Sequence, residues 1–286
     1  KLTNSKKFII GITGSTGVLG KRLIYELNDF DIKFFKGDIS VKQNVYNWVN
    51  HNDLNGIIHF AAIVPTKNVL KNKKKSYQVN YMGTKYLIDA LKKKYKKKKI
   101  WFFFASSSHV YSFSEKKINE KSKIKPISYY GQLKRMSEIY LLKNKKYFKI
   151  CIGRIFSFTD TRQDISFFIP SIFDKIKRNK KYPYSELNKE VRDFLSTKDI
   201  VKIIRNLLEK RFSGVINICS GSGVNLFDVY SIISKLLKKK IVKKKFFGKK
   251  NILVGDNSKV IKIGYIYVDN VHKILRNYIK TNNFRK

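Results

Sequence analysis

The chain has 286 residues, of which 43% are hydrophobic and 14% aromatic, so it can bury a large core and is not an intrinsically disordered protein. Its formal net charge of +42 suggests attraction to anionic ligands, but the lysines are spread along the whole chain, and arginine, the better residue for binding phosphates and bases, is scarce beside lysine. Because no nucleic-acid-binding motif is recognisable, we expect a solvated basic surface and no specific nucleic-acid partner.

The first half of the chain alternates between apolar and amphipathic segments. The apolar segments predict strands at residues 7–13, 32–36, 56–62, 99–108 and 148–156. The amphipathic segments predict helices at residues 18–28, 41–50, 80–94 and from about Tyr130 onward. Apolar strands that are separated by helices indicate an α/β fold with a parallel sheet covered on both faces.

The second half of the chain is less regular. Residues 164–179 and 225–239 have helical periodicity, residues 191–196 predict a strand, and residues 197–210 predict a helix capped by Thr197. This part is therefore predicted to be a smaller, mixed α/β region, some elements of which can return to the first sheet.

Two cysteines, Cys151 and Cys219, each lie in an apolar run that is typical of a strand. Neither their number nor their spacing matches a disulfide scaffold or a metal site, and buried thiols of this kind are typical of a reducing compartment. The sequence contains no signal peptide that we recognise and no apolar run of about 18 residues, the length that spans a membrane. We therefore expect no metal ion, no membrane span and a cytoplasmic location.

A glycine-rich loop, TGSTGVLG, connects the first predicted strand to the first predicted helix. Its glycines, Gly14, Gly17 and Gly20, permit a tight turn and allow the backbone to approach a pyrophosphate, which would bind at the N-terminus of the helix. The alternative is a glycine-rich turn that binds no ligand. The position between a strand and a helix of an alternating chain favours nucleotide binding.

The segment PISYYGQLKRMSE, residues 126–138, places Tyr130 and Lys134 four residues apart. Pro126 disfavours helical backbone at the residue before it, so the helix is predicted to begin near Tyr129 or Tyr130. Residues four apart share a helix face, and an ammonium beside a phenol lowers the pKa of the tyrosine, which can then exchange protons. In a lysine-rich chain the spacing also arises by chance, so the remaining motifs decide the interpretation.

Together these motifs resemble the extended short-chain dehydrogenases/reductases, also called the NAD-dependent epimerase/dehydratase family, over nearly the whole chain. The matching segments, in the family's order, are ITGSTGVLG, GDIS at 37–40, HFAA at 59–62, NYMGT at 80–84, SSSHVY at 106–111, YGQLK, and RDFLSTKDIV with NICSGSG. The resemblance implies a Rossmann-type doubly wound parallel sheet in residues 1–155 and a smaller mixed α/β region that binds a nucleotide sugar in residues 156–286. We also expect a homodimer.

The resemblance assigns the chemistry to Ser107, Tyr130 and Lys134. Tyr130 would exchange a proton with a sugar hydroxyl or ketone, Lys134 would lower its pKa and hold the nicotinamide ribose, and Ser107 would hydrogen-bond the same sugar oxygen. Ser107 ends an apolar strand, where open parallel sheets bind their ligands. The residues implied for binding NADP or NAD, besides Lys134, are Gly14, Thr16, Gly17, Val18, Leu19, Gly20, Lys36, Asp38, Ile39, Ala61 and Ala62.

The residues implied for the nucleotide sugar are Asn80, Ser108, His109, Ser157 and Arg192. Arg192 is predicted to bind the pyrophosphate, because a guanidinium can donate to two phosphate oxygens at once. The alternative for this residue is an ion pair with Asp193. His109 is equally expected as a sugar contact and as a packed or solvent-facing side chain.

Two features bear on the reaction. Dehydratases of the family carry an Asp-Glu pair after the catalytic hydroxyl, where this chain has Ser108 and His109, so a 4,6-dehydratase is disfavoured. Residues 154–176 resemble the GDP-4-keto-6-deoxy-mannose reductases, although Ser157 replaces their usual Asn and Asp160-Thr161 their usual Gly-Pro. We expect reduction of the 4-keto group of an NDP-4-keto-6-deoxyhexose. The alternatives are an NAD-dependent NDP-sugar 4-epimerase and a non-catalytic nucleotide- or RNA-binding protein.

The choice between NADP and NAD depends on the segment after the second predicted strand. An acid there binds the ribose 2′-hydroxyl of NAD, whereas a base accommodates the 2′-phosphate of NADP. The strand IKFFK carries no acid and ends in Lys36, which favours NADP, while Asp38 lies close enough to favour NAD. We expect NADP, with NAD as the alternative.

Overall fold

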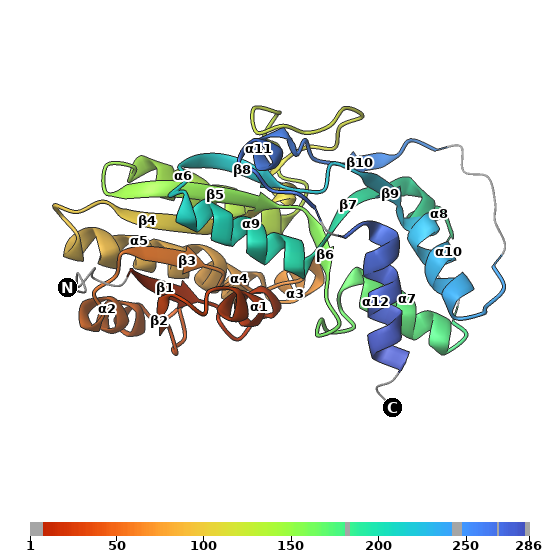
Figure 1. Ribbon diagram of the computed structural model, residues 1–286, viewed down its shortest axis with the longest axis horizontal. Helices are drawn as coiled ribbons and strands as arrows, with labels where there is room; N and C mark the ends of the chain where they lie inside the picture. Colours follow the sequence, from red (N-terminus) through yellow and green to blue (C-terminus); the bar gives the residue numbers. More distant parts are fainter. Residues whose placement is uncertain (1–7, 181–183, 242–247, 268, 284–286) are drawn as a thin grey trace, which may run out of the picture.

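Six parallel strands form the central sheet, in the order β2-β1-β3-β4-β5-β8 (Figure 1). The structure is a computed structural model, and it describes residues 8–180, 184–241, 248–267 and 269–283. The strands of this sheet are β1 (Ile9–Thr13), β2 (Asp31–Phe34), β3 (Gly56–His59), β4 (Ile100–Ser107), β5 (Phe148–Ile155) and β8 (Gly214–Ile218). The order reverses between β1 and β3, and doubly wound sheets bind ligands at the carboxyl ends of the strands beside such a reversal.

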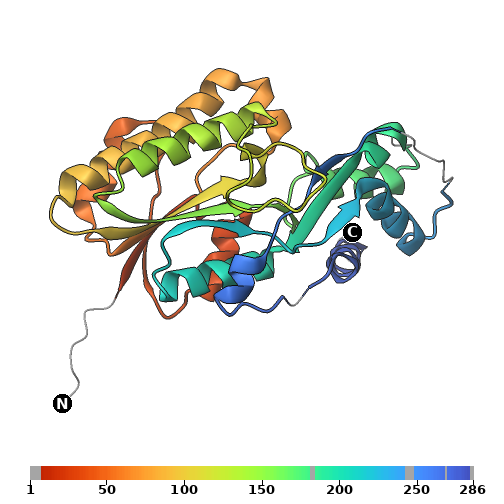
Figure 2. The same ribbon diagram turned by 90° about the horizontal axis from the view of Figure 1, so that it is seen from above.

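Helices cover both faces of this sheet (Figure 2). One face carries α2 (Lys42–His51), α5 (Gly83–Lys94) and α6 (Tyr129–Lys143), and the other carries α1 (Val18–Glu26) and α9 (Thr197–Glu209). The doubly wound parallel α/β fold that the alternating sequence predicts is therefore confirmed.

The apolar sequence of β4 follows from its position between two cores. Trp101 and Phe103 belong to the core beneath α1 and α9, whereas Phe102 and Phe104 belong to the core beneath α2, α5 and α6. Alternate side chains of a strand point to opposite faces, so a strand that is covered on both sides has no polar face.

A smaller group of elements lies beside this sheet (Figure 1). Its strands are β7 (Glu190–Ser196), flanked by β6 (Ser157–Thr159) and β10 (Asn251–Leu253), and β9 (Gly223–Asn225), which pairs antiparallel with β7. Its helices are α7 (Phe168–Lys177), α8 (Tyr184–Lys189), α10 (Leu226–Leu236) and α12 (Val271–Asn283). A short helix, α11 (Ser258–Lys262), contacts β8. The division of the chain into two domains after residue 155 stays a prediction.

Helix starts differ from the predicted ones where tertiary or turn contacts intervene. Ser196, and not Thr197, caps α9, because its Oγ accepts the Asp199 N–H at 3.0 Å, while the Thr197 hydroxyl donates to Asp160 at 2.6 Å. Helix α7 begins four residues later than predicted, since the Asp164 carboxylate accepts the Ser166 N–H in a local turn.

The chain reaches α5 through three short elements that the sequence pattern does not separate. They are α3 (Thr66–Lys71), α4 (Lys73–Tyr77) and a π-helical turn (Gln78–Met82). By contrast, α6 begins at Tyr129 as predicted, with Ser128 as its cap. The two cysteines are buried free thiols, as expected. None of the helices in the described ranges combines the length and apolarity needed to cross a membrane.

A buried histidine, His59, connects the ends of β1 and β3 to α5. Its Nδ1 lies 2.6 Å from the Thr13 hydroxyl and its Nε2 lies 2.8 Å from the Thr84 hydroxyl. The Thr84 hydroxyl donates to the Asn80 carbonyl at 3.0 Å, so it must accept from Nε2–H, and Nδ1 must accept from Thr13. The ring is thus neutral. Burial, assisted by the charge of Lys134, lowers the pKa of His59 to about 3.

This depressed pKa predicts a loss of stability in acid. The unfolded chain takes up a proton at His59 below its ordinary pKa of 6.5, whereas the folded chain resists protonation until about pH 3, so stability falls as the pH falls through this window. Between pH 7 and pH 5 we expect the wild type to lose about 2 kcal/mol more unfolding free energy than His59→Gln, measured by urea denaturation. His109 titrates in both proteins and cancels in the difference. Equal losses in the two proteins would contradict the neutral hydrogen-bonded ring.

Candidate active site

A cavity of about 1150 Å³ opens at the carboxyl ends of the parallel strands. The loops after β1, β2, β3, β4 and β5 line it, together with the first turns of α6 and with parts of α7 and β7. Every site residue named from the sequence lines this cavity except Asn80. Residues that are dispersed between Gly14 and Arg192 in the sequence therefore meet around one space.

The glycine loop forms the end of the cavity beside β1. Gly14 has φ +73°, and a Cβ on it would lie 2.6 Å from the Ala61 nitrogen, while a Cβ on Gly20 would lie 2.3 Å from the Gly14 carbonyl oxygen. A Cβ on Gly17 meets only that same oxygen, at 3.3 Å. Gly14 and Gly20 are thus needed for the loop's own packing, whereas Gly17 leaves open space that a ligand can use.

Helix α1 follows this loop directly, and its N-terminus faces the cavity. Val18, Leu19 and Gly20 line the cavity, and no side chain in the described residues caps the helix. The first turn of a helix leaves backbone N–H groups without intrahelical partners, and these groups bind anions. Loop and helix together fit the pyrophosphate of a dinucleotide.

The segment after β2 brings a base and an acid to the same rim of the cavity. Lys36 is exposed there. The Asp38 carboxylate accepts from the Ser40 hydroxyl at 2.6 Å and from the Ser40 N–H at 2.9 Å, and these bonds lower the pKa of Asp38. Ile39 lies beside it, and Ala61 and Ala62 line the cavity after β3.

Ser107, Tyr130 and Lys134 converge where β4 meets the first turn of α6. Ser107 ends β4, and its Oγ accepts the His109 N–H at 3.2 Å. A short 3₁₀ turn (Ser108–Val110) then carries the chain past α6. A Cβ on Gly131 would lie 2.1 Å from the His109 carbonyl oxygen, so only glycine allows this close approach of helix and strand end. The residue lies inside the Tyr-x-x-x-Lys spacing, but its structural role is not visible from the spacing alone.

The Lys134 ammonium is buried and does not bind the Tyr130 hydroxyl. Its Nζ donates to the Ala105 carbonyl at 2.7 Å and lies 4.9 Å from the centre of the Phe104 ring and 5.7 Å from that of Tyr130. Burial lowers the pKa of Lys134 to about 7, although the charge of Glu138 raises it.

Burial also raises the pKa of Tyr130 above its ordinary value. The expectation of a lowered pKa is therefore wrong, because the phenol is desolvated and the Lys134 ammonium is directed to a backbone carbonyl instead of to the Tyr130 hydroxyl. At neutral pH the tyrosine is a protonated phenol, and the lysine is close to its titration point.

Asn80 is predicted from the sequence to contact the sugar, but it lies outside the cavity. Its side-chain oxygen accepts the Ile63 N–H at 2.6 Å, and its amide nitrogen donates to the Ile63 carbonyl at 3.1 Å. Asn80 is 1% exposed, so it holds the chain after β3 in place instead of facing a ligand.

Arg192 lines the cavity but is held by several partners. Its guanidinium donates to the Asn251 carbonyl at 2.8 Å, pairs with Glu190, and packs against the Phe113 ring at 5.3 Å. The alternative partner considered for it, Asp193, is wrong: that carboxylate is fully buried and accepts instead from the residues around Gly221.

The other polar residues predicted near the sugar, Ser108, His109 and Ser157, line the cavity. His109 Nδ1 lies 2.9 Å from the Ser128 hydroxyl, and its ring packs edge-on against Tyr130. Burial and the charge of Arg192 lower the pKa of His109 to about 4, so it is neutral at pH 7.

The far wall of the cavity comes from the smaller group of elements. It includes Phe158, Gln163, Phe168, Phe194 and Leu226. None of the five was predicted as a site residue, and for the apolar ones the reason is that an apolar residue in a strand or amphipathic helix looks the same whether it faces a core or a ligand.

Comparisons with known proteins agree with this architecture. A family model described as GDP-mannose 4,6 dehydratase matches residues 12–279. GDP-6-deoxy-D-talose 4-dehydrogenase of Aggregatibacter actinomycetemcomitans is 26% identical over 269 residues, which cover 88% of this chain and 90% of that protein.

Two solved structures share the fold. The UDP-glucose 4-epimerase of Thermus thermophilus, in complex with NAD, has a TM-score of 0.85 at 18% identity, covering 98% of this chain and 100% of that one. RMD from Pseudomonas aeruginosa, complexed with NADPH, has a TM-score of 0.83 at 19% identity, covering 98% of this chain and 99% of that one.

The glycine loop makes a prediction that separates ligand space from folding. Gly17→Val places a side chain in the open space beside the loop, so we expect a folded protein that has lost NADPH binding, measured by cofactor fluorescence. Gly20→Ala places a methyl group against the Gly14 carbonyl and should lower the unfolding free energy by about 1–3 kcal/mol, measured by thermal and urea denaturation. A folded Gly17→Val protein that binds NADPH normally would remove the nucleotide assignment of this loop.

Proposed function

The chain belongs to the GDP-mannose 4,6 dehydratase family of extended short-chain dehydrogenases/reductases, whose model matches residues 12–279, and from this membership we propose an NAD(P)-dependent oxidoreductase of nucleotide sugars. Within that class we propose that the enzyme reduces the 4-keto group of an NDP-4-keto-6-deoxyhexose. The observation that carries this choice is a protonated phenol beside Ser107 in a cavity that holds no carboxylate near it, among the residues that the structure describes.

The cavity fits an NAD(P) cofactor. Its volume of about 1150 Å³ lies just above the usual range for single-ligand sites, which suits a dinucleotide together with a nucleotide sugar. The space beside Gly17 and the uncapped N-terminus of α1 would hold the pyrophosphate, and Lys134 and the residues after β3 would hold the nicotinamide ribose. When bound, the cofactor supplies or accepts a hydride. The solved epimerase and RMD structures hold NAD and NADPH respectively.

The protonation states of the residues at the site favour reduction. A ketone that gains a hydride on carbon must gain a proton on oxygen, and Tyr130, whose pKa is raised by burial, holds that proton at neutral pH. Ser107 would donate a hydrogen bond to the same oxygen and stabilise the charge that develops on it. Lys134, with a pKa of about 7, lies 5.7 Å from the centre of the Tyr130 ring, and we propose that its proton replaces the one that Tyr130 gives up through solvent or ligand hydroxyl groups between them.

Dehydration is disfavoured by what lies beside these residues. Removal of water across C5 and C6 needs an acid and a base besides the tyrosine. Ser108 cannot act as either at neutral pH, and His109, which is neutral there with a pKa of about 4, is at most a weak base and supplies no acid. Among the described residues that line the cavity, Asp38 is the only carboxylate, and it follows β2 at the far edge of the sheet.

An epimerase is the second candidate, and Asp38 is the observation that favours it. A carboxylate at the rim suits the 2′-hydroxyl of NAD, and epimerases retain and regenerate their cofactor. Lys36 on the same rim favours the 2′-phosphate of NADPH and hence a reductase. We propose NADPH, because Asp38 Oδ1 is already engaged by Ser40 and because Lys36, which is exposed like Asp38, brings a positive charge to the same rim.

Incubation with NADPH or NADH and a panel of nucleotide 4-keto-6-deoxy sugars tests this proposal. We expect one reduced cofactor to be consumed per sugar reduced, with about a tenfold preference for NADPH, which corresponds to about 1.4 kcal/mol for one exposed lysine–phosphate contact. Interconversion of 4-epimers without net consumption of cofactor would identify the epimerase instead, and release of water from an NDP-hexose would identify a dehydratase.

Tyr130→Phe removes the proposed proton donor while retaining the ring. We expect turnover to fall by about two to four orders of magnitude, with the melting temperature and the affinity for NADPH nearly unchanged. Tyr129→Phe is the matched control, because Tyr129 is the neighbouring residue on α6 and does not line the cavity. Full activity of Tyr130→Phe would refute the assignment of this residue.

A further inference from the structure

Glu138 is a fully buried carboxylate directly behind the proposed site. It lies on α6, one helical turn after Lys134 and two turns after Tyr130. Its Oε1 accepts from the Ser106 hydroxyl at 2.6 Å and from Arg154 Nε at 2.9 Å. Its Oε2 accepts from Arg154 Nη2 at 2.8 Å and from Arg135 Nη1 at 2.9 Å. Four donors thus surround two oxygens.

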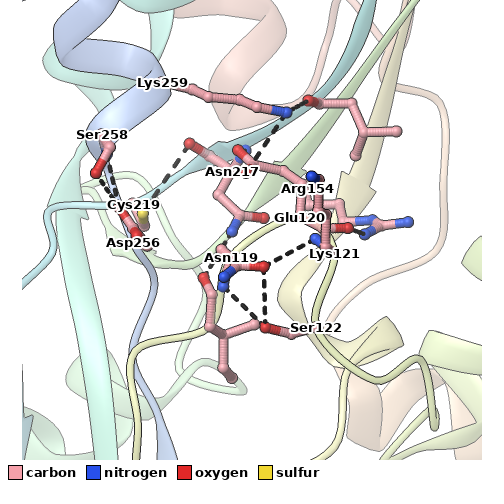
Figure 3. Close-up of polar contacts among 12 residues, drawn as sticks. Asn119, Glu120, Lys121, Ser122, Arg154, Asn217, Cys219, Asp256, Ser258 and Lys259 are labelled. Atoms are coloured by element: carbon pink, nitrogen blue, oxygen red, sulfur yellow. Dashed lines mark hydrogen bonds and ion pairs between the residues drawn. The ribbon is translucent and has the colours of Figure 1, made fainter.

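The chain of contacts continues from Arg154 across the sheet. Arg154 Nη1 donates to the Tyr111 hydroxyl at 2.8 Å, and Tyr111 donates to the Asn217 side-chain oxygen at 2.7 Å. The Glu120 carboxylate accepts the Asn217 N–H at 2.9 Å and forms an ion pair with Lys259 at 3.6 Å (Figure 3). Because arginine can only donate hydrogen bonds, the Tyr111 hydroxyl must accept from Arg154 and donate to Asn217, so the direction of each bond is fixed. The network therefore fixes the relative positions of α6, β4, β5 and β8.

Stability alone does not account for this arrangement. Burying a carboxylate and a guanidinium costs several kcal/mol of desolvation, and apolar residues of the same volume often stabilise a fold equally well. The residues around Glu138 instead connect it to two groups of the proposed site, Ser107 and Lys134. Ser106 precedes Ser107 on β4, and Lys134 shares the face of α6 that carries Glu138.

We propose that Glu138 is a positioning residue for the site: it fixes the carboxyl end of β4 against α6 through Ser106, and its buried charge acts on Lys134. The functional half of this inference rests on the proposed oxidoreductase activity. Burial lowers the pKa of Lys134 to about 7, and Glu138 is the group that raises it, so without this charge the pKa would be lower still and a smaller fraction of the lysine would be protonated at neutral pH.

The other groups that face Lys134 do not replace Glu138. On α6 the neighbouring titratable groups are Tyr130, which is a neutral phenol at this pH, and Arg135, whose positive charge is paired with Glu138. From β3 the nearby group is His59, which is neutral and buried. From β4 the contacts are the Ala105 carbonyl and the Phe104 ring. Arg154 on β5 carries a positive charge, but this charge is paired with Glu138 itself.

Glu138→Gln tests the charge while keeping the shape of the side chain. Loss of the negative charge lowers the pKa of Lys134, so the ammonium loses its proton at lower pH. In the wild type we expect turnover to fall as the pH rises through the pKa of Lys134, and in Glu138→Gln we expect this fall to begin at a lower pH. Turnover at pH 8 should drop about tenfold for each unit by which the pKa of Lys134 is lowered. An unchanged pH profile would overturn the proposal.

A double variant separates this effect from a loss of stability. Glu138→Gln leaves Arg154 charged and buried without its counter-ion and should lower the melting temperature. Glu138→Gln/Arg154→Met removes both charges and should recover part of that loss, while the pH profile stays displaced because Glu138 is still absent. If the double variant regains both the stability and the wild-type pH profile, Glu138 acts only through stability and the proposal fails.

Asp89→Asn is the matched control. Asp89 is another carboxylate held by side-chain hydrogen bonds, from Lys85 on its own helix at 2.7 Å and from Tyr140 on α6 at 2.6 Å, and its charge does not act on Lys134. It should not move the pH profile. A wild type that reduces no 4-keto sugar would refute the proposed function but not this inference, because the pH dependence of NADPH affinity, followed by fluorescence, reports the same displacement. Equal pH dependence in the wild type and Glu138→Gln would then overturn the inference.

Discussion

The buried ammonium of Lys134 is the group on which the arrangement of the cavity depends. A cation without solvent is costly, and here three contacts compensate that cost: the Ala105 carbonyl, the Phe104 ring and the negative charge of Glu138. Each partner sits on β4 or α6. The strand end and the helix must therefore meet at one separation, and Gly131 allows that separation by presenting no side chain to the 3₁₀ turn after β4.

Burial keeps two titratable groups near Lys134 neutral, although it moves their pKa values in opposite directions. Tyr130 keeps its proton because the phenolate would be poorly solvated, and His59 stays neutral because the imidazolium would be. The site is consequently a neutral acid beside a lysine at its titration point. This pairing suits a reaction in which one proton is delivered to the substrate and then replaced, which is what a ketone reduction requires.

Local sequence patterns are sufficient for the features that depend on neighbours in the chain. The apolar runs predict the parallel sheet, the glycine spacing predicts the loop after β1, and Pro126 predicts the start of α6. The patterns fail where a partner comes from elsewhere. Asn80 is held by the Ile63 backbone, Ser196 and not Thr197 caps α9, and desolvation of Tyr130 follows from packing that no i, i+4 spacing records.

The difference between buried and exposed residues explains why roles for Ser107, Tyr130 and Lys134 are easier to propose than a preference for NADPH or NADH. Ser107, Tyr130 and Lys134 are buried or partly buried among fixed partners, and burial sets the direction in which the pKa values of Tyr130 and Lys134 move. Lys36 and Asp38 lie at an exposed rim, where solvent screens charge and a single contact contributes only about 1 kcal/mol. The proposed reaction therefore depends on groups in the interior of the fold, while the proposed preference for NADPH over NADH depends on two solvated side chains of opposite charge.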